Sequence, residues 1–270
     1  MQLARIETTG RVIQISYGIV EGDEVTMISN DPFDTWPGRV FQPRPSGAAM
    51  PLSGVKLLPP VVPRTMYAVA LNYPSHLGEQ VAAPRPEIFV KGLNSLAGPS
   101  DKIILPEGSE RVDYEGEIVV VMGRKCKKAS VEDALSYVYG YTCGNDVSAR
   151  DWQRDDRQWF RGKSCDTFGV LGPWIVDGLD AMNIELCTRL NGEEVQHCNS
   201  SEMVNSIAET ISFISQFATL DAGDVIFTGT SGQPRQMNPG DVVEVDVGGV
   251  GVLRNEVIAD PVPSNWIDKR

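Results

Sequence analysis

The chain has 270 residues, of which 41% are hydrophobic and 22% are charged, so it can bury a substantial core without disulfides or a structural metal. Its formal net charge of −12 disfavours binding to nucleic acid or to an anionic membrane surface, since both depend on Lys and Arg neutralising phosphate. No apolar run approaches the roughly 20 residues of a membrane span, and the N-terminal stretch "MQLARIETTGRV" lacks the apolar segment of a signal peptide, which predicts a cytoplasmic protein.

The cysteine pattern argues against a disulfide framework and against a thiolate zinc site. There are five cysteines, an odd number, and none of them forms a C-x-x-C pair. Reduced, partly buried thiols are therefore expected.

Residues 1–60 are predicted to form a small β-rich N-terminal domain, followed by a larger domain over residues 61–270. The stretch 12–29, "VIQISYGIVEGDEVTMIS", predicts two strands joined at the turn "EGD", because β-branched residues stand on both sides of a glycine. Residues 41–63 contain "QPRPSG" and "LLPPVVP", a proline-rich composition that is typical of a linker crossing the surface.

Beyond residue 64 the predicted elements are mainly strands. "MYAVAL", "EIVVVMG" and "DVIFTGT" are short apolar runs bounded by turn-forming residues. Two helices are predicted: a short one over 130–140, begun by Ser130 and ended by Gly140, and an amphipathic one within 200–220. The apolar positions of the second helix follow the helical period of about 3.6 residues; they are Met203, Val204, Ile207, Ile211, Ile214 and Phe217. Because strands do not alternate regularly with helices, the expected fold class is α+β, mostly β.

Three common kinds of site are excluded by residue spacing or number. In "RGKS" the position five residues before Gly162 is Arg157, where a P-loop needs glycine, and in "GGVGVLR" Arg254 replaces the third glycine of a dinucleotide-binding motif. His76 and His197 are the only histidines, which excludes a histidine-rich zinc or iron centre.

Acidic residues precede an apolar run in "VDYEGEIVVV", residues 112–121. On a strand, Asp113, Glu115 and Glu117 would share one face, because side chains alternate with a period of two residues. With Asp146 from the polar segment "GNDVSARDWQ", the two glutamates would give the carboxylate-rich set that Mg²⁺ or Mn²⁺ prefers. The alternative is an exposed strand face whose acids lie in solvent.

Six segments, in this order, are similar to motifs of the fumarylacetoacetate hydrolase family. They extend from about residue 66 to about residue 257 and read "ALNYPSHLGE", "DYEGEIVVVMG", "GYTCGNDVSARDWQ", "GKSCDTFGVLGPW", "LNGEEVQ" and "LDAGDVIFTGTSG". The resemblance implies a mixed β-roll catalytic domain, usually in a homodimer, with Mg²⁺ or Mn²⁺ as cofactor.

The resemblance also assigns site residues. The metal carboxylates of the family map onto Glu115, Glu117 and Asp146, which leaves Asp113 for a structural hydrogen bond or for a role behind the ligands. Three further motif residues of the family map onto Lys163, Gln153 and Thr230.

Family members commonly cleave a C–C bond next to a ketone, which suggests roles for these residues. His76 with Glu79 is predicted to deprotonate a water, since residues i and i+3 on a helical turn are neighbours. Lys163 and Gln153 are predicted to donate to the oxyanion. The predicted substrate-binding residues are Arg150, Thr230 and Tyr73, the last at the start of a loop, residues 73–86, that is expected to close as a lid.

Each of these roles has an ordinary structural alternative. His76 can be a surface or satisfied core residue, Lys163 a surface cation, and Arg150 a partner of Asp151 or Asp155. The loop can be a plain connection.

Two departures from the family pattern point to an altered substrate end of the pocket. Ala70 stands where many members have glycine, and "TGTSGQP" lacks the form "TGTPxG" of smaller relatives.

Three functions are compatible with these residues. The first is metal-dependent hydrolysis of an acylpyruvate or related β-diketo acid. The second uses the same metal site to decarboxylate oxaloacetate, or to isomerise or hydrate an unsaturated oxo-diacid of aromatic catabolism. The third is a catalytically silent metal-binding domain. The expected partner is a small anionic oxo-acid, with no nucleic acid and no membrane.

Overall fold

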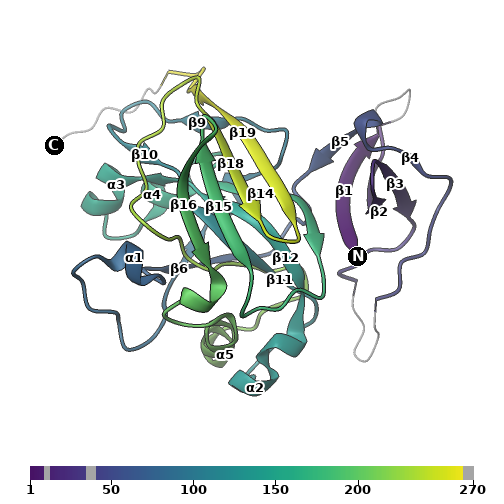
Figure 1. The fold of residues 1–270 in the computed structure, drawn as a ribbon, viewed down its shortest axis with the longest axis horizontal. Helices are drawn as coiled ribbons and strands as arrows, with labels where there is room; N and C mark the ends of the chain where they lie inside the picture. The colour runs from purple at the N-terminus through teal and green to yellow at the C-terminus, as the bar shows by residue number, and fades with distance from the viewer. Residues whose placement is uncertain (9–12, 35–40, 264–270) are drawn as a thin grey trace.

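The computed structural model describes residues 1–8, 13–34 and 41–263. Strands predominate and helices are short, which confirms the expected α+β, mostly β, class. Figure 1 shows a main body and a smaller N-terminal lobe formed by β1 to β5. Among the described residues, no helix combines the length and the apolar character that a membrane span requires. The cytoplasmic location expected from the sequence stays a prediction.

The N-terminal lobe is an antiparallel sheet. Its elements are β1 (Gln2–Thr8), β2 (Ile15–Glu21), β3 (Glu24–Ile28), β4 (Met50–Pro51), the 3-10 turn η1 (Leu52–Gly54) and β5 (Val55–Leu58). The predicted hairpin is confirmed as β2 and β3, although Val12 lies outside the described residues. The expectation of a plain linker over 41–63 is wrong, because β4 and β5 lie within it. β5 carries an apolar run that pairs with β1, and this pairing outweighs the proline-rich composition.

The main body stacks two sheets. The first continues from the N-terminal lobe in the order β1-β14-β12-β11-β17-β6-β7, and β8 pairs with β14. Its strands are β6 (Met66–Ala70), β7 (Glu87–Lys91), β8 (Leu96–Ala97), β11 (Gly116–Met122), β12 (Val138–Asp146), β14 (Gly169–Val176) and β17 (Val225–Phe227).

The second sheet has the order β16-β15-β18-β19-β9, and Figure 1 shows it as a layer over β11 and β12. Its strands are β9 (Ile103–Leu105), β15 (Glu185–Leu190), β16 (Glu193–Asn199), β18 (Val242–Val247) and β19 (Gly251–Ala259). A two-stranded ladder joins β10 (Val112–Asp113) to β13 (Ser148–Ala149).

Strand β11 is buried on both faces, which explains its continuous apolar run. Ile118 and Val120 face the core shared with the second sheet, whereas Val119 and Val121 face a core shared with the N-terminal lobe. Because of this alternation, Glu117 lies on the face of Val119, and Gly116 lies on the face toward the second sheet.

The helices are α1 (Pro74–Leu77), α2 (Val131–Ala134), α3 (Arg150–Asp155), α4 (Phe160–Ser164) and α5 (Ile207–Phe217), with 3-10 turns η2 (Leu93–Ser95), η3 (Leu135–Tyr137) and η4 (Ser200–Glu202). Ser130 caps α2 as predicted, by accepting a hydrogen bond from the backbone N of Asp133 at 3.2 Å. The helix does not reach Gly140, which belongs to β12, because residues from Val138 onward pair with β11.

The predicted amphipathic helix is confirmed in part. It begins at Ile207, behind a capping box between Ser206 and Glu209, so Met203 and Val204 lie outside it. Ile207, Ile211 and Ile214 form its buried stripe. Phe217 is 75% exposed. It follows Ile207 by ten residues, and at about 3.6 residues per turn this places the two side chains on different sides of the helix.

The five cysteines are free thiols, three of them buried and two of intermediate exposure. The expectation of reduced, partly buried cysteines is therefore confirmed.

The N-terminal lobe and the main body share a sheet and a core. β1 pairs with β14 at Gln2 and Leu3, and Leu3 packs in the same apolar cluster as Leu171, Val119 and Phe227. The two parts are therefore expected to unfold together.

Replacing Leu3 tests this packing. Leu3→Ala is expected to lower the free energy of unfolding by about 2–5 kcal/mol, since Leu3 is fully buried and its removal leaves a cavity. Urea denaturation measures the change and should show one transition. The matched control, Ile15→Ala, removes a side chain that is 52% exposed and should change stability by at most about 0.5 kcal/mol. Equal effects of the two variants, or a separate early transition of the N-terminal lobe, would contradict the shared core.

Candidate active site

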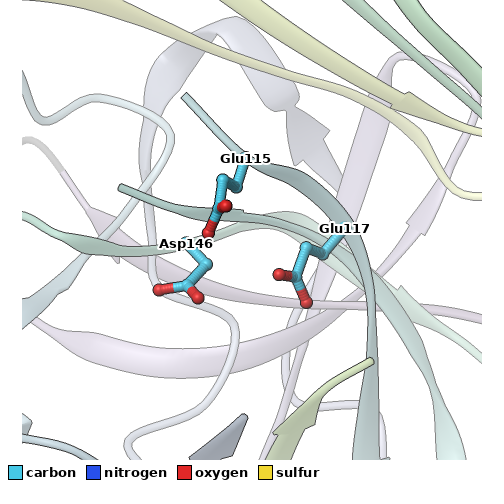
Figure 2. Close-up of side chains that lie close together, drawn as sticks. All are labelled: Glu115, Glu117 and Asp146. Atoms are coloured by element: carbon cyan, nitrogen blue, oxygen red, sulfur yellow. The ribbon is translucent and has the colours of Figure 1, made fainter. Parts of the chain in front are cut away.

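Three carboxylates converge where β11 begins. Figure 2 shows the side chains of Glu115, Glu117 and Asp146 close together. One oxygen from each lies within 4.8 Å of one from each of the others, and all three residues are buried. The cluster expected from the sequence is confirmed, and the alternative of an exposed acidic face is wrong.

The strand that carries these acids is interrupted. β10 ends at Asp113 and β11 begins at Gly116, so Glu115 lies in the break rather than in one continuous strand as predicted. The break is fixed by neighbours from β12: the backbone N of Glu115 donates to Asn145 Oδ1 at 2.9 Å, and the N of Asp146 donates to the Glu115 carbonyl at 2.9 Å.

Three cations neutralise two of the three carboxylates. Lys163 Nζ lies 2.5 Å from Glu115 Oε2 and 2.6 Å from Asp146 Oδ2, Lys91 binds the other oxygen of Asp146, and Arg150 Nη2 binds Glu115 Oε1. Burial opposes ionisation of Glu115, but Arg150 and Lys163 outweigh it and lower the pKa of Glu115 below its ordinary value. Burial lowers the pKa of Lys91, whereas in Lys163 the attraction of Asp146 and Glu115 exceeds the effect of burial and raises the pKa.

Glu117 differs from the other two carboxylates. Among the described residues its only hydrogen bond is from the backbone N of Gly229, at 2.6 Å. Burial, together with the charges of Asp146 and Glu115, raises its pKa well above the ordinary value. Gly229 has φ 99°, and a Cβ there would lie 2.7 Å from Asn72 Cβ, so this donor position requires glycine.

The donor set fits a hard divalent cation. Buried carboxylate oxygens around one point are ligands of the kind that Mg²⁺ and Mn²⁺ prefer. Glu117, with one backbone donor and no ion pair among the described side chains, is the carboxylate of the three whose oxygens are most available to such an ion.

Asp113 lies outside this cluster and has a structural role, as predicted. It accepts two hydrogen bonds from Arg111, at 2.9 Å each, and one from Arg150 Nε at 2.9 Å. Arg150 thus bridges Asp113 and Glu115. Within the described parts of the chain its hydrogen bonds go to Asp113, Glu115 and Gln153, and the predicted alternatives Asp151 and Asp155 are not among these partners.

His76 lies beside the carboxylates. Its Nδ1 is 2.8 Å from the carbonyl of Gly232, which can only accept, so Nδ1 carries the hydrogen. In the neutral ring Nε2 is then an unprotonated base, and it lies 3.8 Å from Glu115 Oε1.

Glu79 does not contact His76 among the described interactions of this structure. Helix α1 ends at Leu77, and Gly78 follows with φ 60°, so the chain leaves the helical path before Glu79. Glu79 is exposed, does not line the pocket, and makes no hydrogen bond with His76 among the described residues. The predicted i, i+3 contact is wrong in this structure.

Two of the predicted substrate-binding residues have other partners. Tyr73 is 1% exposed and does not line the pocket, and burial together with Cys198 and Glu117 raises its pKa. Thr230 lines the pocket, but its hydroxyl donates to the Gly116 carbonyl at 3.0 Å and is not free to donate to a substrate.

The pocket above the carboxylates has a volume of about 130 Å³ and one apolar wall. The ring of Phe89 packs against Trp159 at 5.1 Å between centroids, and Lys163 Nζ lies 5.0 Å from the Phe89 ring centroid. Gln153 also lines the pocket, and its Oε1 accepts from Arg150 at 3.0 Å, which leaves Nε2 as a donor. The remaining lining residues are Val69, Ala70, Leu71, His76, Glu115, Glu117, Asp146, Arg150, Lys163 and Thr230.

Several site residues were missed by the reasoning from sequence. Lys91 ends the apolar strand "EIFVK", a position that flags a buried cation, but its partner Asp146 is 55 residues away. Ser148, which donates to Glu115 Oε2 at 2.9 Å, and Asn145 both lie in the polar segment that contains Asp146.

Comparison with protein families gives two matches. Residues 65–258 match the family described as fumarylacetoacetate (FAA) hydrolase C-terminal, and residues 1–60 match the family described as Rv2993c-like, N-terminal.

Individual relatives differ in their named activities. The chain is 42% identical over 224 residues to the human protein named oxaloacetate tautomerase FAHD2A, mitochondrial. This alignment covers 77% of this chain and 71% of that protein. A crystal structure of 5-carboxymethyl-2-hydroxymuconate delta-isomerase from Mycobacterium smegmatis matches with a TM-score of 0.88 and 38% identity, over 96% of this chain and 100% of the other. Maleylpyruvate hydrolase from Sphingobium sp. SYK-6 matches with a TM-score of 0.78 and 26% identity, over 96% and 100% of the two chains.

The family match covers most of the main body, and the tautomerase and isomerase relatives align over three-quarters or more of the chain at over 30% identity. The resemblance seen in the sequence motifs is thereby confirmed. The chain belongs to the fumarylacetoacetate hydrolase family.

Proposed function

We propose that the protein is a divalent-cation-dependent isomerase of a small 2-oxo diacid, which moves a proton between carbon and oxygen as in keto–enol interconversion. The observation that carries this proposal is the placement of His76, whose Nε2 lies 3.8 Å from Glu115 Oε1 while Nδ1 is held by the Gly232 carbonyl. The names of an oxaloacetate tautomerase and of a muconate isomerase among the relatives support it.

Hydrolysis of an acylpyruvate, the first function expected from the sequence, has less support. It needs a water that is held and deprotonated, and the residue predicted to orient His76 for that task, Glu79, lies outside the pocket. A proton transfer at carbon requires only the base and stabilisation of the enolate.

Glu115, Glu117 and Asp146 would hold the divalent cation, which supplies Lewis-acid stabilisation of the enolate oxygen when bound. The surrounding charges favour a doubly charged substrate. When all groups are ionised, the four carboxylates of Asp113, Glu115, Glu117 and Asp146 face the four cations of Lys91, Arg111, Arg150 and Lys163. A divalent ion then leaves two positive charges, which the two carboxylates of an oxo-diacid balance.

The chain's own groups have separate tasks in this proposal. His76 Nε2 takes the proton from the carbon next to the ketone, and the imidazolium then returns that proton to the enolate oxygen, while its Nδ1–H is held by the Gly232 carbonyl. Enol-to-keto conversion is the reverse of these two transfers. Gln153 Nε2 donates to the oxygen on which negative charge develops. Phe89 and Trp159 exclude water from the carbon chain. Closure of the loop over residues 73–86 and assembly as a homodimer stay predictions.

Replacing His76 tests the proposed base. His76→Gln is expected to lower kcat for enol-to-keto conversion of oxaloacetate in the presence of Mn²⁺ by about 10²- to 10⁴-fold, the usual contribution of a general base. Loss of enol absorbance measures the rate. The control is His197→Gln, since His197 is exposed on β16 and binds Glu185 and Glu194 instead. Full activity of the His76 variant would refute its role, and pyruvate release from an acylpyruvate without tautomerisation would favour hydrolysis.

Replacing Glu117 tests the cation site without reference to activity. Mn²⁺ at 100 times its Kd should stabilise the wild-type protein by about 2.7 kcal/mol, and Glu117→Gln should lose most of this gain. Without metal, the variant should be no less stable than wild type, because the change removes a buried charge that Asp146 and Glu115 repel while an amide oxygen still accepts from Gly229. Thermal unfolding with and without Mn²⁺ measures both effects. Glu256→Gln, at an exposed position of β19, serves as the control, and an undiminished Mn²⁺ effect in the Glu117 variant would place the ion elsewhere.

A further inference from the structure

Strand β17 does not extend along the first residues of β11, from Gly116 to Ile118. β17 pairs with β11 only at Val119, Val120 and Val121, so the backbone nearer to the carboxylates needs other partners on that side. Thr228 donates to the Ile118 carbonyl through its backbone N at 3.2 Å and its Oγ1 at 2.8 Å, and side chains supply both partners of Gly116. The carbonyl of Gly116 accepts from Thr230 Oγ1 at 3.0 Å, and the N of Gly116 donates to Gln196 Oε1 at 3.0 Å.

Gln196 comes from β16, in the second sheet, and is 4% exposed. Besides accepting from Gly116, it donates through Nε2 to Thr230 Oγ1 at 2.7 Å and to the Ser231 carbonyl at 2.6 Å. The Ser231 carbonyl can only accept, which fixes the orientation of the Gln196 amide. Gly116, Thr230 and Gln196 therefore form a closed ring of hydrogen bonds.

This ring joins the two halves of the candidate active site. Gly116 lies between Glu115 and Glu117 in the chain. The segment 229–232 provides the donor to Glu117 at Gly229 and the acceptor for His76 Nδ1 at Gly232. One buried amide thus connects the backbone of the carboxylate pair to the loop that holds the proposed base.

The sheets approach so closely at this point that residue 116 must be glycine. A Cβ on Gly116 would lie 1.9 Å from Thr188 Oγ1 and 3.2 Å from Gln196 Oε1. The close approach is what allows a side chain from the second sheet to reach the backbone of the first.

We propose that Gln196 is a positioning residue that sets the carboxylates Glu115 and Glu117 and the base His76 relative to one another. Its action on the carboxylates is independent of the reaction, whereas its action on His76 rests on the isomerase function proposed above. The bland alternative is a buried glutamine that only satisfies its own hydrogen bonds and stabilises the fold.

Two variants distinguish a positioning role of Gln196 from a purely structural one. Gln196→Met keeps the volume and removes every hydrogen bond of the ring, so Mn²⁺ binding should weaken by about 10- to 100-fold, as for other residues that orient metal ligands. Gln196→Glu keeps an acceptor for Gly116 but cannot donate to Ser231, so kcat for oxaloacetate tautomerisation should fall with little change in KM. Isothermal titration with Mn²⁺ and steady-state kinetics measure these effects at a temperature where circular dichroism shows each variant folded.

Two controls identify a purely structural effect. Thr188→Val changes a neighbouring buried hydroxyl that has no hydrogen-bond partner among the described residues, and it should leave Mn²⁺ affinity and kcat unchanged. Val245→Ala, in the core at β18, should lower the thermal midpoint without changing Mn²⁺ affinity.

The proposal is overturned if a folded Gln196→Met variant binds Mn²⁺ as wild type does, or if Val245→Ala weakens Mn²⁺ binding as much as Gln196→Met does. Should Gln196→Met fail to fold, wild-type kcat in Gln196→Glu overturns the link to His76. If wild type itself does not tautomerise oxaloacetate, the isomerase function fails, and the Mn²⁺ affinities still decide whether Gln196 positions the carboxylates.

Discussion

Holding three carboxylates together in a buried place is the constraint on which the rest of the structure depends. Removing an ion from water costs several kcal/mol even after relaxation, and like charges at close range add to this cost. Lys163, Lys91 and Arg150 offset it for Glu115 and Asp146. Glu117 is the carboxylate that this arrangement leaves with a single backbone donor among the described residues. This difference in hydrogen bonding among the three carboxylates motivates the proposal that the cluster binds a divalent cation.

The same constraint explains why the site is assembled from so many parts of the chain. Glu117 is the second residue of β11, which is buried on both faces, and Asp146 ends the neighbouring strand β12. Lys91 ends β7, the strand at the edge of the same sheet. Helix α4 adds Lys163, and the second sheet adds Gln196 behind the ligands. Rigid strands fix these groups by packing, so that the charges are in place before a substrate arrives.

The sequence predicted those features that depend on local spacing. The shared face of Glu115 and Glu117, the hairpin of β2 and β3, the cap at Ser130 and part of the buried stripe of α5 follow from periodicity or turn chemistry within a few residues. Asp146 is instead indicated by its polar segment and by the family resemblance. The errors arose where distant partners decide the outcome. β5 forms because β1 offers an edge, and Tyr73 is buried because the core closes over it. The error at Glu79 has a local cause instead, because the neighbouring Gly78 ends the helical turn. Lys91 and Gln196 act on residues 55 and 80 positions away in the chain, which spacing alone cannot indicate.

The central claim is that Glu115, Glu117 and Asp146 form one divalent-cation site held by this network. Anomalous diffraction from crystals equilibrated with Mn²⁺ tests it most directly, because the signal locates the ion independently of any activity. The account predicts one strong Mn²⁺ peak per chain, bonded to an oxygen of each of the three carboxylates. An empty cluster at saturating Mn²⁺, with Lys163 still bound to Glu115 and Asp146, would contradict it.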